Sequence, residues 1–85
     1  MAYPFAQMPT LGEFVEYAVS QGCMMHEFPG RMIGPRGSVT PRCLRGLKNV
    51  ISILPNIDDD DRLTPLLLRN LCAQLGLDIN HFSMH

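Results

Sequence analysis

The chain has 85 residues, of which 46% are hydrophobic and 18% charged, and its formal net charge at pH 7 is −1. This length and balance predict one soluble domain and exclude a disordered tail and a second core. No apolar run approaches the ~20 residues that span a bilayer, and residues 1–9 lack the basic start and apolar stretch of a signal peptide. We therefore expect a cytoplasmic protein without membrane contact.

A capping box marks the start of the first helix. Thr10 can accept a hydrogen bond from the backbone, and Glu13 follows three residues later. Apolar residues then recur at helical spacing until Gly22: Leu11, Phe14, Val15, Ala18 and Val19. The pattern predicts a helix over residues 11–21 with this stripe facing the core.

The next two segments predict a β-hairpin. Residues 23–28 form the first strand candidate, and residues 31–34 form its partner. Pro29 and Gly30 lie between them and are a strong turn dipeptide. We therefore place the hairpin turn at this Pro-Gly pair.

The following segment alternates between loop and strand character. Residues 35–46 are interrupted by prolines and glycines, which predicts a loop with at most brief extended structure. Residues 47–54 are rich in β-branched side chains and end at Pro55, which predicts a further strand. Residues 58–61 are four consecutive aspartates that lead into the next helix.

The last helix has both a start and a stop signal. Thr64 can cap it, Pro65 suits the first helical position, and Gly76 can take the left-handed conformation that ends it. We expect its apolar stripe to pack against Phe14 and Val19 of the first helix; the stripe consists of Leu68, Leu71, Cys72 and Leu75.

This element order predicts an α+β fold of the form α-β-β-(β)-α, with two helices packed on one face of a short antiparallel sheet. The domain spans residues 10–82, with residues 1–9 as an N-terminal extension and residues 83–85 as a tail. Within the domain we expect Phe82 to fold back onto the core.

The basic residues are concentrated in the middle of the chain. Between Glu27 and Asp58 there is no acidic residue, yet five of the seven basic residues lie there: Arg31, Arg36, Arg42, Arg45 and Lys48. A basic segment attracts phosphate groups, so these five are candidate nucleic-acid contacts. The alternative is a solvated surface with balancing charges nearby, because five cations without interleaved aromatic residues are few for such a site.

Three of these features occur together in one known family. The chain has an amphipathic helix ending in Gly22, a hairpin at Pro29, and over residues 63–77 the pattern Leu-Thr-Pro-x-x-x-Arg-x-x-Cys-x-x-Leu-Gly-Leu, followed by Phe82. This combination resembles the HicA toxin family. The resemblance implies a double-stranded-RNA-binding-like fold, ribonuclease activity on messenger RNA, and neutralisation by a HicB antitoxin.

The chain departs from that family at the catalytic motif. HicA proteins carry Gly-Ser-His on the second strand, and the histidine is catalytic. Here the corresponding residues 29–33 read Pro-Gly-Arg-Met-Ile, without Ser-His. The chain is therefore either a toxin that works differently or a degenerate relative that binds RNA without cleaving it.

His26 is the candidate catalytic residue, because His81 and His85 fall in the C-terminal tail. An imidazole with a pKa of about 6.5 can act as general acid or base, and Arg31 across the hairpin would steady a phosphate. The alternative is a histidine on the polar face of an edge strand, since no second titrating group accompanies it. Glu27 points to the other face of the strand.

Metal and cofactor sites are not indicated. The aspartates at 58–61 lack the glycine and glutamate of an EF-hand, and carboxylates before a helix are also stabilised by its dipole. The three cysteines share no Cys-x-x-Cys spacing and are expected to be small buried apolar residues. No phosphate-binding glycine loop or dinucleotide motif is present.

A second functional class stays open beside RNA binding. The chain can also be a non-enzymatic module that binds a protein through its sheet edge or a methionine-rich face. A homodimer is one form that such a module takes.

Overall fold

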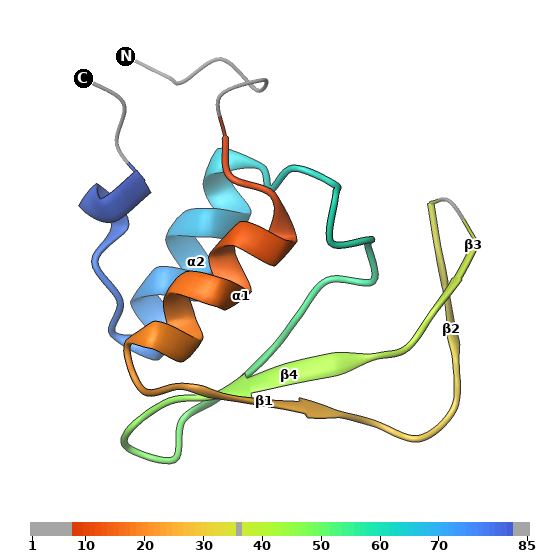
Figure 1. The fold of residues 1–85 in the computed structure, drawn as a ribbon, viewed down its shortest axis with the longest axis horizontal. Coiled ribbons are helices and arrows are strands. Elements are labelled where there is room, and N and C mark those ends of the chain that lie inside the picture. Colours follow the sequence, from red (N-terminus) through yellow and green to blue (C-terminus); the bar gives the residue numbers. More distant parts are fainter. Residues whose placement is uncertain (1–7, 36, 83–85) are drawn as a thin grey trace.

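The computed structural model describes residues 8–35 and 37–82, which form two α-helices over one face of a small antiparallel sheet (Figure 1). The elements in chain order are α1 (Leu11–Ser20), β1 (Met24–Glu27), β2 (Met32–Gly34), β3 (Gly37–Val39), β4 (Arg42–Arg45), β5 (Ile51–Ile53), α2 (Pro65–Leu75) and a 3-10 helix (Ile79–Phe82). The predicted α+β class is confirmed. Neither α-helix in the described part is long and apolar enough to cross a membrane.

Both helices begin and end as their capping signals predict. The Thr10 hydroxyl accepts a hydrogen bond from the Glu13 N–H, and the Glu13 carboxylate accepts one from the Thr10 N–H. The Thr64 hydroxyl accepts from the N–H of Leu67 in the same way. Gly76 ends α2 with φ 69°, in the left-handed region that glycine adopts without steric cost.

The predicted hairpin turn at Pro29-Gly30 is wrong. β1 pairs with β4, placing Glu27 opposite Arg42, whereas β2 pairs with β3, placing Met32 opposite Val39. Between these two ladders the outgoing strand has four residues, 28–31, and the returning strand has two, 40 and 41. The two extra residues bend one long hairpin, and its tip lies further along the chain, between β2 and β3.

The predicted loop over residues 35–46 is also wrong, because it contains β3 and β4. In the three-stranded sheet the order is β1-β4-β5, so β4 is the central strand. Its four residues have an arginine at each end and follow Pro41, so neither alternation nor length marks them as a strand. Pairing with a strand on each side stabilises β4 despite its weak local signal.

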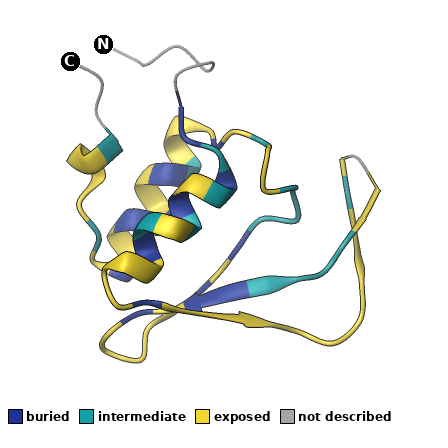
Figure 2. Cartoon of the chain, in the orientation of Figure 1, coloured by how far each residue is buried: buried dark blue, intermediate teal, exposed yellow. Residues whose placement is uncertain are grey.

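The core lies between the helices and the sheet (Figure 2). Leu71 and Leu75 are buried as expected, together with Phe14. Val19, however, is 50% exposed. The buried stripe of α1 runs instead through Leu11, Phe14 and Ala18, and Val19 lies beside that stripe.

The C-terminal segment packs against α1. The rings of Phe82 and Phe14 are 5.9 Å apart, which confirms that Phe82 returns to the core. His81 does not lie in a tail: its ring stacks on Tyr17 at 3.9 Å with an interplanar angle of 12°. The residues from 79 to 82 are therefore part of the folded domain.

The two-stranded arm formed by β2 and β3 contacts the segment that follows β5. Gly34 lies so close to the backbone carbonyl of Asn56 that a side chain at position 34 would overlap the carbonyl oxygen. Backbone cannot move aside as a flexible side chain does. Glycine is therefore required here by close approach rather than by its dihedral angles.

Substitution of Gly34 by alanine is expected to lower stability by about 1–3 kcal/mol, because the overlap outweighs the entropy that alanine removes from the unfolded chain. Thermal unfolding measures this effect. Ser38→Ala on the exposed surface of β3 is the control and should melt like the wild type. Equal melting of Gly34→Ala and the wild type would show that the arm does not rest on Asn56.

Candidate functional site

The two faces of the sheet differ in what covers them. Leu44 of β4 is buried in the core beneath the helices, and the Ser52 hydroxyl of β5 donates to the side-chain carbonyl of Gln74 in α2 at 2.5 Å. Because side chains alternate along a strand, their neighbours face away from the helices. We call this surface the outer sheet face; it consists of Met24, His26, Cys43, Arg45, Ile51 and Ile53.

The register arranges this face in two rows. One row is Met24, Arg45 and Ile51, and the other is His26, Cys43 and Ile53. All are exposed except Cys43, which is 4% exposed. The outer sheet face is thus apolar along its β5 edge, carries the guanidinium of Arg45 on its central strand, and has the imidazole of His26 beside Met24 on its β1 edge.

His26 is exposed, as expected for an edge strand, but Arg31 does not lie across from it. The residue opposite His26 is Cys43. Arg31 lies beyond the bend and donates from Nη2 to the carbonyl of Ser38 at 3.2 Å. The expected pairing of His26 with Arg31 is therefore wrong, since it depended on the misplaced turn.

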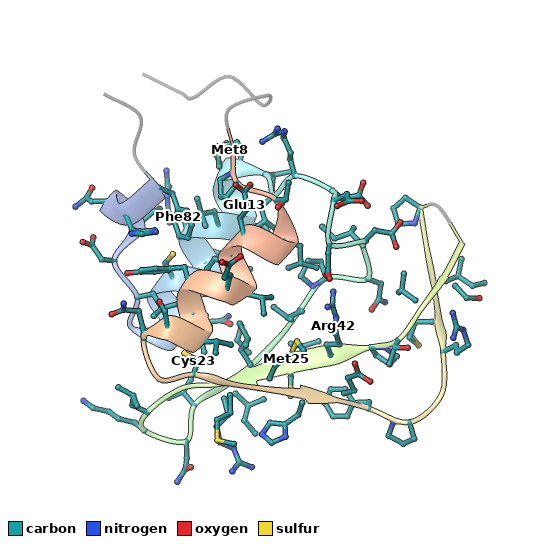
Figure 3. The ribbon with its side chains drawn as sticks, in the orientation of Figure 1. Met8, Glu13, Cys23, Met25, Arg42 and Phe82 are labelled. Atoms are coloured by element: carbon teal, nitrogen blue, oxygen red, sulfur yellow. The ribbon has the colours of Figure 1, made fainter. Side chains whose placement is uncertain are left out.

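Arg31 and Arg42 lie together in a groove on the helix side of the sheet. Figure 3 shows Arg42 rising from β4 toward the loop before α2. Its Nη2 lies 2.7 Å from the Asp59 carboxylate. The groove has a volume of about 310 Å³, and its lining includes the carboxylates of Glu27, Asp58 and Asp59. Three carboxylates around two guanidiniums leave this groove without excess positive charge.

The other predicted cations lie elsewhere. Arg45 is on the outer sheet face, and Lys48 is exposed in the turn between β4 and β5. Neither forms an ion pair within the described ranges 8–35 and 37–82. Arg36 lies outside the described residues. The four candidates that the structure describes therefore do not form one continuous basic patch.

The aspartate loop supports α1 rather than the helix that follows it. The N–H of Leu11 donates to the carbonyl of Asp61 at 2.8 Å, and the N–H of Gly12 donates to that of Asp59 at 3.0 Å. These bonds satisfy two of the free donors at a helix start. The first turn of α2 contains no acidic residue.

Metal ligands do not gather in the described part of the chain: no group of three or more His, Cys, Asp or Glu side chains there is placed to hold an ion. Cys23, Cys43 and Cys72 are free and buried, as predicted. Burial raises the pKa of the Cys23 and Cys72 thiols, and the nearby Asp78 raises that of Cys72 further.

The exposed isoleucines are what the sequence interpretation missed. Ile51 and Ile53 were expected only as part of a strand, without an assigned face; they are 55% and 72% exposed, while Ser52 between them is buried. The alternating pattern Ile-Ser-Ile indicates that the two isoleucines share one face of the strand. It does not reveal which face, because here the polar serine faces the core and the apolar isoleucines face outward.

Comparison with known proteins does not assign this site. No family model, curated protein or solved structure matches the chain.

Proposed function

We propose that the domain binds single-stranded RNA through the outer sheet face without cleaving it, as a non-catalytic relative of the HicA-type toxins. The observation that carries the proposal is the charge of this face. Its ionisable side chains on the described strands are Arg45, His26 and the buried Cys43 thiol, with no carboxylate among them. Glu27, Asp58 and Asp59 all line the groove on the other side.

The same surface offers two kinds of contact that single-stranded RNA uses. Arg45 and the neighbouring Lys48 attract phosphate groups. Unstacked bases then stack on the ring of His26 and make apolar contacts with Met24 and the isoleucines, because stacking and apolar contact tolerate any base. Three further arginines stay predicted RNA contacts: Arg31, Arg36 and Arg42. We expect them to contribute less than Arg45 and Lys48, since Arg42 already forms an ion pair with Asp59.

The surroundings of His26 favour binding over cleavage. General acid–base cleavage of RNA needs a proton donor and an acceptor on either side of the phosphate, or a group that orients the imidazole. The cross-strand neighbour of His26 is a buried thiol, and Glu27 projects from the opposite face. His26 therefore contributes a flat ring rather than half of a catalytic pair.

Removal of both free cations should weaken RNA binding and its salt dependence. In Arg45→Ala with Lys48→Ala, the slope of log affinity against log salt is expected to fall by about 1.4, because each phosphate of a single strand that is no longer neutralised contributes about 0.7. Filter binding of labelled RNA at several salt concentrations measures it. Arg69→Ala removes an exposed cation from α2 and is the matched control. An unchanged slope in the double variant would exclude the outer sheet face as the RNA site.

A protein-binding module is the second candidate, and a specific observation favours it. Met24, Ile51 and Ile53 together expose a large apolar share of the outer sheet face, at 58%, 55% and 72% of their surfaces. Ile51 and Ile53 adjoin along the β5 edge, and contiguous exposed apolar groups of this kind are typical of protein interfaces. A HicB-like antitoxin, which the family resemblance implies, and a second copy of the chain are the two partners of this class.

A further inference from the structure

The backbone hydrogen bonds of β5 leave one edge of the sheet open. The N–H of Leu54 donates to the carbonyl of Arg42 at 2.9 Å, and the N–H of Gly46 donates to the carbonyl of Val50 at 2.7 Å. In an antiparallel pair, residues bonded to the neighbour alternate with residues whose groups point away. Val50, Ser52 and Leu54 therefore face β4 with their backbone groups.

Ile51 and Ile53 point their N–H and C=O groups away from the sheet. β5 is the last strand in the order β1-β4-β5, and these groups make no backbone bond to another described segment. Proteins usually protect such an edge with lysine, proline or a bulge. Residues 50–54 contain only Val, Ile, Ser, Ile and Leu. Pro55 follows only after them, so the edge is unprotected over Ile51–Ile53, the length of β5.

We propose that a second copy of the chain pairs with this edge, β5 against β5 in antiparallel orientation, about a twofold axis at Ser52. In this register Ile51 of each copy lies opposite Ile53 of the other. Both are residues with outward-pointing groups, so each of the two pairs exchanges both of its N–H···O=C bonds. The contact is isologous and closes at two copies.

The local sequence fits its own copy in either direction. Ile51-Ser52-Ile53 reads the same forward and backward, and an apolar residue follows on each side. Antiparallel pairing therefore matches like with like and places no charge opposite a charge. A palindromic, uncharged edge favours a second copy over an unrelated strand, which would need no such symmetry.

The side chains reinforce the backbone pairing. Ile51 and Ile53 both project from the outer sheet face, so the joint brings four isoleucines into one cluster that spans the two copies. The joined sheets form six strands with one continuous outer sheet face. Because the contact is one short strand, the dimer is expected to depend on concentration. This dimer does not depend on RNA binding. It is the homodimer form of the protein-binding module, the second function considered above.

The first test is the mass in solution without RNA. Light scattering or sedimentation from about 10 μM to 1 mM should show the wild type rising from 9.5 kDa toward twice that mass. Ile53→Lys should stay at the monomer mass at every concentration. At about 10 μM, where the wild type is also monomeric, the two should have the same melting temperature, because position 53 is 72% exposed. The control is Ile33→Lys on β2, where the side chain is 88% exposed, and it should dimerise like the wild type.

The second test addresses the register. Ile51→Glu and Ile53→Lys are each expected to be monomeric, and an equimolar mixture should recover the dimer because Glu and Lys then lie opposite each other. A mixture of Ile51→Glu with Ile51→Lys should not, because position 51 lies opposite position 53. A wild type that stays monomeric at every concentration, an Ile53→Lys variant that still dimerises, or failure of the first mixture to associate would overturn the proposal.

Discussion

Replacement of Leu71 by alanine is expected to lower the free energy of unfolding by about 2–5 kcal/mol. Leu71 is 2% exposed and lies in the core cluster with Phe14 and Leu44. The substitution removes buried methyl groups and leaves a cavity that the two helices and the sheet cannot close. Since small domains have only about 5–15 kcal/mol of stability, the variant should be close to unfolding at physiological temperature.

Urea unfolding followed by circular dichroism gives this difference directly. Leu66→Ala on the same helix is the matched control, because Leu66 is 64% exposed and its truncation leaves no cavity. It should shift the midpoint little. Equal stability of Leu71→Ala and the wild type would mean that the apolar stripe of α2 does not face the sheet.

The three cysteines are expected to react with iodoacetamide at least ~10³-fold more slowly than a cysteine peptide, because reaction requires local or global opening of the fold. A raised thiol pKa acts in the same direction for Cys23 and Cys72: at pH 8 a smaller fraction of each is the reactive thiolate. Mass spectrometry of the labelled, digested protein follows each site separately.

Cys43 should respond selectively to changes on the outer sheet face. Its side chain lies between His26 and Ile53, so His26→Ala should expose the thiol and speed its labelling. Cys23 belongs to the core cluster on the helix side and serves as the internal control. Equal acceleration at both cysteines would indicate general destabilisation, and no change at Cys43 would place His26 away from it.

The helices were predictable because their signals are local. The capping pair Thr10 and Glu13, and the Thr64 and Gly76 boundaries, depend on residues within one turn of each helix end. The sheet was not, because its pairing depends on partners far along the chain. Pro29-Gly30 has the dihedral preferences of a turn, with Gly30 at φ 93°, yet the β4 strand that β1 pairs with starts only at Arg42.

The candidate site was predictable only as separate residues. His26 and Arg45 were singled out for their chemistry, and both lie on the outer sheet face. The cross-strand register decides which face of the sheet each residue occupies. It places His26 and Arg45 on one face with the exposed Ile53, and it places Arg42 on the other, where Asp59 forms an ion pair with it. No local pattern contains that register, because it joins residues far apart in the sequence. A hairpin turn placed at the wrong residues therefore gives every strand residue a wrong partner.

Retention and recovery of one labelled single-stranded RNA on the purified protein tests RNA binding by the outer sheet face most directly. At a salt concentration of about 50 mM, the wild type should retain the RNA, release it as salt rises, and return it at full length. Arg45→Ala with Lys48→Ala should retain less, and Arg69→Ala as much as the wild type. No retention at low salt, equal retention by the double variant, or shortened RNA that disappears with His26→Ala would contradict binding without cleavage at this face.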